Sequence, residues 1–306
     1  MVESPVLLVG FNRPEYLQQV FNQIKKNRPK RLYVAIDGPR PHVIDDEKNC
    51  RACRQIVDQI DWDCDLYTLF REKNLGCGHG MFNAISWAFE NENQLIILED
   101  DCVPSDSFFP YCDMMLERYK DDTRVWQVAG RSYHPNTRFF DHSDYIFSHY
   151  PHVWGWATWK RCWNQYDFYM SDFQDFISIG GAINSSATKK LGRKENRYFE
   201  KLFEDINSDS SYHAWGPQWS YLMSRNNVYS IVPHKNLIHN IGTVGTHTSK
   251  HQKEDIPSEE MSMDLKHPRF VIPNREYDIY HGRKVVYPRP NLFMQLAVKL
   301  KHLIMK

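Results

Sequence analysis

The feature that most constrains this chain is a run of four apolar residues, 95–98, that leads directly into the carboxylates Glu99, Asp100 and Asp101. A short, continuous apolar run is typical of a strand that is buried in a parallel sheet. Ligands of open α/β sheets bind at the carboxyl ends of the strands, where these acids lie. Adjacent carboxylates repel one another unless a cation neutralises them, and oxygen ligands suit Mg²⁺ or Mn²⁺. The sequence therefore predicts a metal site that holds phosphate groups, with a solvated acidic turn as the alternative.

The first hundred residues alternate between strand-like and helix-like patterns. Apolar runs predict strands at 6–9, 31–37, 65–70 and 95–98, and helical periodicity lies between them, at 14–26, 45–60 and 78–89. This alternation predicts an α/β fold with a doubly wound, mostly parallel sheet flanked by helices. Neither the P-loop pattern nor the dinucleotide fingerprint is present, which argues against a P-loop kinase and an ordinary NAD enzyme.

Several residues near the predicted strand ends are candidates for ligand contacts. Arg13 precedes Pro14 at the start of the first helix, and a helix N-terminus favours anions. Asp37 ends the second strand, and the glycines around His79 permit close approach of the backbone to a ligand. We interpret Arg13 as a phosphate contact, with an arginine on the surface as the alternative.

Composition excludes several classes of protein. Lys+Arg and Asp+Glu are both 38, so that nothing favours broad nucleic-acid binding. Seven cysteines in a chain of 306 residues argue against a disulfide framework. No signal-peptide pattern and no stretch long enough to cross a bilayer are found. The 9 Trp and 17 Tyr suit a pocket for sugar rings or bases, although such residues also fill cores.

The second half is less regular. We interpret 131–151 as loop-like, and the aromatic run 152–163 either as a sugar-stacking wall or as a core element. Helical patterns follow in 172–205 and from Trp215, a strand pattern in 228–232, and a Gly/His/Thr loop in 239–247 that we interpret as a flap. The resulting division is a first half at 1–130, a second half at 131–248 as a smaller subdomain, and a C-terminal extension at 249–306.

The last segment, 291–306, has a basic amphipathic pattern that predicts a helix. Such a helix can lie on an anionic membrane surface, or it can dock on its own domain or on a partner.

The acidic strand end, Glu99-Asp100-Asp101, with the helix pattern that follows it, resembles GT-A nucleotide-diphospho-sugar glycosyltransferases. It is similar to the N-acetylglucosaminyltransferase I type and to bacterial hemolytic-protein-like sugar transferases. The resemblance covers roughly residues 4–250. It implies a GT-A type fold with a Mn²⁺ or Mg²⁺ cofactor bound by Asp101, and with Glu99 and Asp100 in contact with the sugar nucleotide.

Further site residues follow from the same resemblance. The nucleotide-sugar contacts that it implies, beyond the acidic residues, are Phe11, Asn12, Arg13, Asp37, Gly76 and His79. The acceptor and sugar contacts are Trp154, Gly155, Trp156, Trp215 and His247. The family has a catalytic base in a Trp-Asp pattern at the start of the helix after the acceptor segment, but this chain has Gly216 after its tryptophan. Nearby candidates for the base are Asp205, Asp209 and His213.

The expected activity is that of a metal-dependent hexosyl- or N-acetylhexosaminyltransferase. It would move a sugar from a nucleotide-diphosphate donor to a hydroxyl of a glycan or lipid-linked acceptor, with inversion, in bacterial polysaccharide biosynthesis. The alternatives are a sugar-1-phosphate nucleotidyltransferase and a binding protein without turnover. We expect a cytoplasmic location, with residues 291–306 as a peripheral contact on the inner face of the membrane.

Overall fold

The structure is a computed structural model, and it describes residues 2–208, 214–242 and 256–288. Its centre is an eight-stranded mixed sheet with the strand order β3-β2-β1-β4-β8-β6-β9-β7. The bounds of its strands are β1 Val6–Gly10, β2 Arg31–Ile36, β3 Asp65–Phe70, β4 Gln94–Glu99, β6 Val125–Ala129, β7 Tyr145–Ser148, β8 Trp156–Trp159 and β9 Tyr229–Pro233. A separate pair is formed by β5 (Cys102–Pro104) and β10 (Ile238–Asn240), which run antiparallel.

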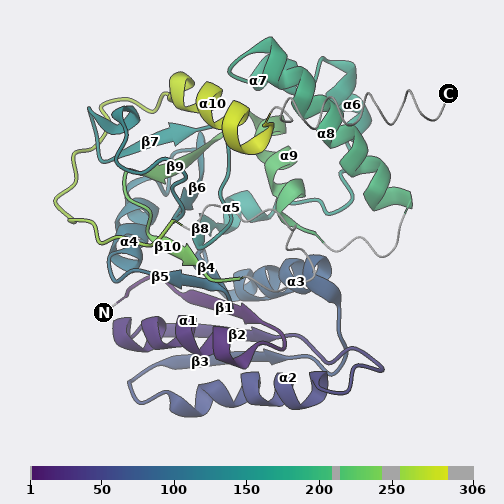
Figure 1. Cartoon of the computed structure of the whole chain (residues 1–306), viewed down its shortest axis with the longest axis vertical. Helices are drawn as coiled ribbons and strands as arrows, with labels where there is room; N and C mark the ends of the chain where they lie inside the picture. The colour runs from purple at the N-terminus through teal and green to yellow at the C-terminus, as the bar shows by residue number, and fades with distance from the viewer. Residues whose placement is uncertain (1, 209–213, 243–255, 289–306) are drawn as a thin grey trace, which may run out of the picture.

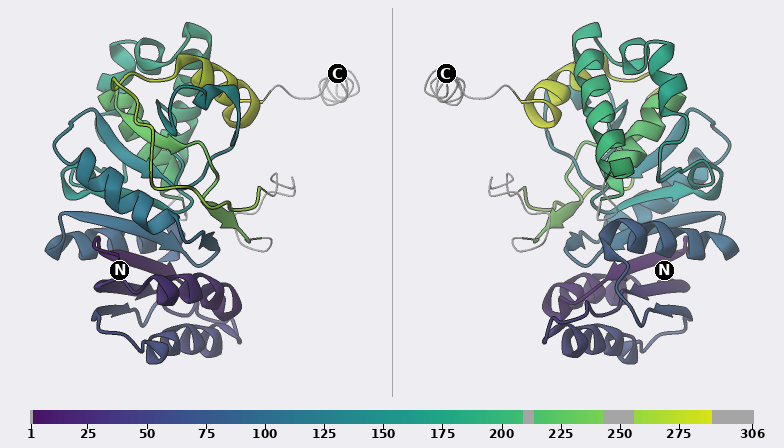
Figure 2. Two further views of the ribbon diagram at one scale, coloured as in Figure 1. Left: turned by 90° about the vertical axis from the view of Figure 1, so that its left-hand side faces the viewer. Right: turned by 90° about the vertical axis from the view of Figure 1, so that its right-hand side faces the viewer.

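Helices flank this sheet (Figure 1). They are α1 Pro14–Asn27, α2 Asp46–Arg54, α3 Gly76–Asn91, α4 Phe108–Arg118, α5 Lys160–Trp163, α6 Phe173–Ser178, α7 Ala182–Ser185, α8 Lys189–Ser208, α9 Gly216–Asn226 and α10 Arg275–His281. Short 3-10 turns lie at Gln55–Gln59 and Arg138–Phe140, and a π-helical turn at Gly282–Val286 follows α10. In the two side views, α1 and α2 lie at one end of the molecule, and α6 to α8 with α10 lie at the other (Figure 2).

The first four strands of the chain, β1 to β4, pair in parallel in the order β3-β2-β1-β4. Their chain connections run outward from β1 to β3 and then return to the other side of β1, where β4 is placed. The strand order therefore reverses between β1 and β4, and such a topological switch point is the usual ligand crevice of a doubly wound sheet.

The predicted fold class is confirmed: the protein is an α/β protein with a mostly parallel sheet between helices. The predicted strands at 31–37 and 95–98 agree with β2 and β4 to within one residue at each end. The first helix begins at Pro14, as predicted, and it buries its whole apolar stripe, Leu17, Val20, Phe21 and Ile24. Apolar periodicity predicted these elements because each one buries a local pattern of side chains against the sheet.

Among its described residues, the second half contains three strands that the sequence did not predict, namely β7, β8 and β10. Strand β8 lies within the aromatic run and pairs antiparallel with both β4 and β6. Its four residues are all buried, so no polar–apolar alternation marks it as a strand. Strand β7 lies in the stretch that we interpreted as loop-like, and it pairs antiparallel with β9 at the edge of the sheet.

Residues 256–288 pack closely on the preceding domain. Tyr277 and Asp278 in α10 have no exposed surface, and the Ser148 hydroxyl donates a 2.6 Å hydrogen bond to the Asp278 carboxylate. Glu260 accepts hydrogen bonds from the backbone N–H groups of Asp106 and Ser107, so that it caps α4 from a distant part of the chain. The part of the predicted extension that the structure describes is therefore built into the domain. The predicted helix at 291–306 lies outside the described residues.

Among the helices of the described chain, none is both long enough and apolar enough to cross a membrane.

Candidate functional site

The switch point brings an arginine and the acidic run together. Strands β1 and β4 are parallel neighbours in a register that pairs Val9 with Glu99, so both chains leave the sheet at the same edge. The chain after β1 turns through Phe11 and Asn12 to Arg13, which is the N-cap residue of α1. The chain after β4 continues into Asp100 and Asp101.

The Arg13 guanidinium binds both aspartates. Its Nε donates a 3.1 Å hydrogen bond to Asp100 Oδ2, and its Nη2 donates to Asp100 Oδ1. The same Nη2 also contacts Asp101 Oδ2 at 3.1 Å. Side-chain exposure is 6% for Asp100, 19% for Asp101 and 28% for Arg13, so the contacts between the arginine and the two aspartates are largely removed from water. Two parallel N–H···O bonds of this kind give a strong, well-oriented ion pair.

The charges of the three residues are tightly linked. Burial raises the pKa of Asp100 to about 6, and the Arg13 charge opposes this rise. Burial alone would lower the pKa of Arg13, but the charges of Asp100 and Asp101 more than offset this, and its pKa is raised. Because a guanidinium stays protonated in proteins, Arg13 is a permanent positive charge at this end of the sheet.

A thiol from α3 lies near the same acidic residues. Burial raises the pKa of Cys77, and the negative charges of Glu99, Asp100 and Asp101 raise it further. The sulfur therefore stays a neutral thiol at physiological pH, and it is unsuited to nucleophilic chemistry.

Strand β10 and the two residues after it lie against Asp101. The backbone N–H of Ile241 donates a 2.9 Å hydrogen bond to the Asp101 carbonyl oxygen. Asn240 Nδ2 lies 3.4 Å from Asp101 Oδ1. At Gly242 a Cβ atom would lie 2.3 Å from Asp101 Oδ2, so only glycine allows this close approach. The carboxylate thus lies between the Arg13 guanidinium and the chain at 240–242.

We tested whether these residues suit a divalent ion. Asp100 is bonded to Arg13, whereas Asp101 is partly exposed. Among the described residues, its Oδ1 makes only long contacts, to Asn240 at 3.4 Å and to Cys102 Sγ at 3.5 Å. Within the described ranges, no group of three or more His, Cys, Asp or Glu residues could hold a metal by itself. Mg²⁺ commonly takes only one or two protein carboxylates and completes its shell with substrate phosphates and water. The residues fit an ion of that kind and do not form a closed protein cage.

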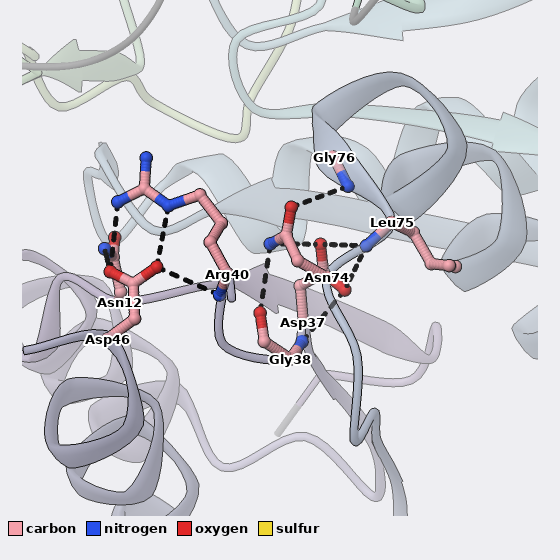
Figure 3. Close-up of polar contacts among 8 residues, drawn as sticks. All are labelled: Asn12, Asp37, Gly38, Arg40, Asp46, Asn74, Leu75 and Gly76. Atoms are coloured by element: carbon pink, nitrogen blue, oxygen red, sulfur yellow. Dashed lines mark hydrogen bonds and ion pairs between the residues drawn. The ribbon is translucent and has the colours of Figure 1, made fainter. Parts of the chain in front are cut away.

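A second acidic residue, Asp37, organises the loops after β2 and β3. Its carboxylate accepts hydrogen bonds from the backbone N–H of Leu75 at 3.0 and 3.1 Å, from Asn74 Nδ2 at 3.0 Å, and from the N–H of Gly38 at 2.9 Å (Figure 3). Gly76 donates its N–H to the Asn74 side chain at 3.1 Å and has a positive φ of 74°. Burial raises the pKa of Asp37, and the backbone hydrogen bonds of Leu75 and Gly38 oppose the rise. The structure thus uses Asp37 to fix two loops at the sheet edge, and its contact with a nucleoside stays a prediction.

A third carboxylate, Asp46 in α2, joins the first loop to the second. Asn12 Nδ2 donates a 2.6 Å hydrogen bond to Asp46 Oδ1, and Arg40 donates to both carboxylate oxygens, at 2.7 and 3.0 Å (Figure 3). The Arg40 guanidinium also lies over the Phe11 ring, 5.3 Å from its centroid. Hydrogen bonding to Arg40 is the main reason why the pKa of Asp46 is lowered.

An open hollow of about 710 Å³ lies beside these loops. Its lining includes three basic side chains, Arg40, His42 and Lys73, together with Asn74 and the largely exposed Ile44. Glu47 and Glu72 also contribute to its wall. Because Asn74 bonds to Asp37 and Arg40 bonds to Asp46, the hollow is bounded by the two carboxylate networks described above.

His79 lies in the first turns of α3 and stacks on Phe168, with 4.3 Å between ring centroids and 18° between ring planes. The contact of His79 with the base of the nucleotide stays a prediction.

The predicted sugar-stacking residues divide into two groups. Trp154 is partly buried, and the Arg131 guanidinium lies 5.4 Å from its ring centroid. Gly155 has a φ of +58° and lies so close to β10 that a Cβ would be 2.2 Å from Ile238 Cδ1. Both residues lie at the same edge of the sheet as the acidic residues, because β8 runs antiparallel to β4.

Trp156 and Trp215 are corrections to the prediction. Trp156 has no exposed surface, Trp215 is 4% exposed, and their rings stack 5.6 Å apart in the core. Apolar burial between the sheet and α9 accounts for both, so neither presents a ring to a sugar in this structure.

The structure adds little support for any of the candidate catalytic bases. Asp205 lies in α8 with a 45% exposed side chain and is paired with Lys201 at 3.0 Å. Asp209, His213 and His247 lie outside the described residues. Gly216 begins α9 next to Val153, and a Cβ there would lie 3.3 Å from the valine side chain.

Sequence reasoning missed several residues that shape the site, namely Arg40, Asp46, Asn74, Arg131, Asn240 and Gly242. Arg131 is buried and donates hydrogen bonds to the carbonyl oxygens of Ile238 and Ile256, so that it holds β10 in place. One available signal was the position of Arg131, which follows Gly130 just after the end of β6, a strand end at the same edge.

No protein-family model matches the chain, and no curated protein sequence matches it. Partial similarities to solved structures are found. S. aureus TarS 1-349 has 13% sequence identity and a TM-score of 0.37, and the match covers 53% of this chain and 48% of that one. HddC from Yersinia pseudotuberculosis has 10% identity and a TM-score of 0.33, with 54% of this chain and 80% of that one covered. The inositol-1-phosphate CTP transferase from T. maritima has 8% identity and a TM-score of 0.31, with 54% of this chain and 74% of that one covered. The chain spans about half the length of TarS 1-349. At TM-scores this low, the similarities bear neither on function nor on the site.

Proposed function

We propose that this protein is a metal-dependent glycosyltransferase. It would transfer a sugar from a nucleoside diphosphate donor to a hydroxyl of a glycan or lipid-linked acceptor. The observation that carries the proposal is the meeting of Arg13, Asp100 and Asp101 at the switch point between β1 and β4. A switch point is where open α/β sheets bind nucleotides, and here it combines a fixed cation with a partly exposed carboxylate.

The donor would lie along the edge formed by the ends of β4, β1 and β2. Its diphosphate would lie beside Arg13 and Asp101, and its nucleoside beside the hollow of Arg40, His42, Lys73 and Asn74. Arg13 at the N-terminus of α1 offers a guanidinium that matches the geometry of phosphate oxygens. Acidic and basic side chains both line the hollow, so it offers hydrogen-bonding groups of both kinds to a nucleoside.

Asp101 is the residue that would hold Mn²⁺ or Mg²⁺, with Glu99 as the neighbouring carboxylate. When bound, such an ion supplies positive charge to a diphosphate leaving group. Arg13 would add to that stabilisation while it stays anchored on Asp100. Asp100 is therefore a positioning residue, since its contact is with Arg13 and not with the reacting atoms.

The acceptor would approach from the β8 side, where Trp154 and Gly155 lie at the same edge of the sheet as Asp101. Trp154 keeps part of its surface open and is backed by Arg131, so it is the aromatic residue best placed to contact a sugar ring.

A second candidate function is a sugar-nucleotide or glycan binding protein without turnover. It is favoured by Gly216, which has no group to accept a proton, and by the exposed, ion-paired position of Asp205. Binding of the donor without any transfer or hydrolysis would be its signature.

The two candidates are tested by thermal shift with a panel of nucleotide sugars, with and without Mn²⁺, followed by transfer assays on any sugar that binds. A bound ligand raises the melting temperature by mass action. We expect a Mn²⁺-dependent rise for one class of donor, and its loss in Asp101→Ala. Asp106→Ala is the matched control, because this nearby carboxylate is exposed and pairs with Lys26. Unchanged donor binding in Asp101→Ala would refute the proposed metal site.

A further inference from the structure

We infer that Arg13 is a resident counter-ion of the acidic strand end, and that its contact with Asp101 opposes the binding of a divalent ion there. The inference rests on the proposed function, since it concerns the metal that we propose for Asp101. It goes beyond that function because it makes metal affinity depend on an arginine that need not touch the metal.

The contacts of a single nitrogen atom carry the inference. Arg13 Nη2 donates to Asp100 Oδ1 and lies 3.1 Å from Asp101 Oδ2, so one NH2 nitrogen links the two carboxylates. The other arm of the guanidinium, Nε, binds only Asp100, at 3.1 Å, among the contacts that the structure describes for it. Asp100 thus holds the arginine, and the contact with Asp101 is the weaker and more exposed of the two.

A divalent ion and the guanidinium compete for the same carboxylate. An ion bound to Asp101 needs at least one carboxylate oxygen, and its charge repels a guanidinium in contact with that group. Oδ2 is approached by Arg13, and a substituent as small as a Cβ on Gly242 would overlap it, so little space remains on that side. The ion is therefore expected to approach through Oδ1, and its repulsion of the guanidinium favours withdrawal of Nη2 from Oδ2, while the Nε contact with Asp100 can persist.

This competition predicts effects of opposite sign for two partners of one ion pair. Arg13→Gln removes the competitor, so Mn²⁺ should bind more tightly, by about tenfold, as expected from the loss of one charge-assisted hydrogen bond. Asp100→Asn removes the anchor of the arginine and leaves its full charge to Asp101, so Mn²⁺ should bind several-fold more weakly. If the two substitutions merely damaged the fold, both of them would weaken the binding of Mn²⁺.

The experiment is a titration of the full chain with Mn²⁺ alone, without nucleotide, followed by electron paramagnetic resonance of the free ion. Lys26→Gln is the matched control, because it removes one positive charge from the same helix at an exposed position. Arg13→Lys is a second variant that keeps the charge but lacks the planar fork needed to bridge two carboxylates. We expect its Mn²⁺ affinity to lie between those of the wild type and Arg13→Gln.

The outcomes separate this inference from the proposed function. If Mn²⁺ binds to the wild type in an Asp101-dependent way and Arg13→Gln binds it equally well or more weakly, the inference is overturned and the proposed function stands. If neither the wild type nor Arg13→Gln binds Mn²⁺ through Asp101, both the inference and the proposed metal dependence are overturned. Tighter binding in Arg13→Gln with weaker binding in Asp100→Asn supports the inference.

Discussion

The buried carboxylate Glu195 should make the protein less stable as the pH rises through neutrality. Glu195 lies in α8 and is 7% exposed, and the Ser186 hydroxyl donates a hydrogen bond to its Oε2. Burial raises its pKa from 4.5 to about 7, against a hydrogen bond from Tyr150 that lowers it. The folded protein therefore keeps a proton on this group at pH values where the unfolded chain has already lost it.

The size and sign of the effect follow from linkage. Below pH 4.5 the group is protonated in both states, so its contribution to the free energy of unfolding is fully present. Between about pH 4.5 and 7 the unfolded chain binds fewer protons, and stability falls by about 1.4 kcal/mol per pH unit. The total loss above pH 7 is about 3 kcal/mol. Glu195→Gln, which cannot ionise, should escape this loss.

Urea unfolding of the wild type and of Glu195→Gln at pH values from 5 to 8.5 measures the effect. The two proteins should be close in stability at pH 5, and the variant should be more stable at pH 8 by up to about 3 kcal/mol. Part of the decline should persist in the variant, because burial also raises the pKa of Asp278 to about 7. Glu200→Gln, at an exposed position of the same helix, is the control and should follow the wild-type profile. Parallel pH profiles of Glu195→Gln and the wild type would refute the reasoning.

Two glycine substitutions test how closely β10 is seated against the site. Gly155→Ala should lower the free energy of unfolding in urea by about 2–5 kcal/mol, because of the positive φ and the overlap with Ile238. Adding Ile238→Ala should relieve the overlap but not the backbone strain. A loss of stability below about 0.5 kcal/mol in the single variant would contradict the structure. Gly242→Ala should displace the Asp101 carboxylate and weaken Mn²⁺ binding in a resonance titration while leaving global stability near that of the wild type. Unchanged Mn²⁺ affinity in this variant would argue that the metal does not use Asp101.

Much of the N-terminal half was predictable from the sequence because its signals are local. A buried parallel strand is a short apolar run, and a helix that covers it has an apolar stripe, so β1, β4 and α1 can be recognised one at a time. The place of the site at the carboxyl end of β4 was predictable for a similar reason, since the order of elements fixes which strand ends share an edge.

What the sequence could not predict depends on contacts between distant residues. Strand β8 is a strand because β4 and β6 lie on its two sides, and its own residues are as apolar as those of a core helix. The cap of α4 comes from Glu260, some 150 positions along the chain. No local pattern announces such partners, because they are selected by tertiary packing.

The acidic residues show the same limit at the site itself. From the sequence, three adjacent carboxylates call for a cation, and a divalent metal is the natural candidate. The structure shows that Arg13 already neutralises part of this charge, because it is bonded to Asp100 and in contact with Asp101. The number of acidic residues in this run therefore overestimates the number of ligands available to a metal, because Asp100 is buried and hydrogen-bonded to Arg13. If Asp101 is the principal ligand, most of the metal's coordination shell must come from water and from the diphosphate. It follows that Mn²⁺ should bind weakly to the protein alone and more tightly together with a nucleoside diphosphate. Equal affinity in its presence and absence would mean that the protein supplies more ligands than these residues provide.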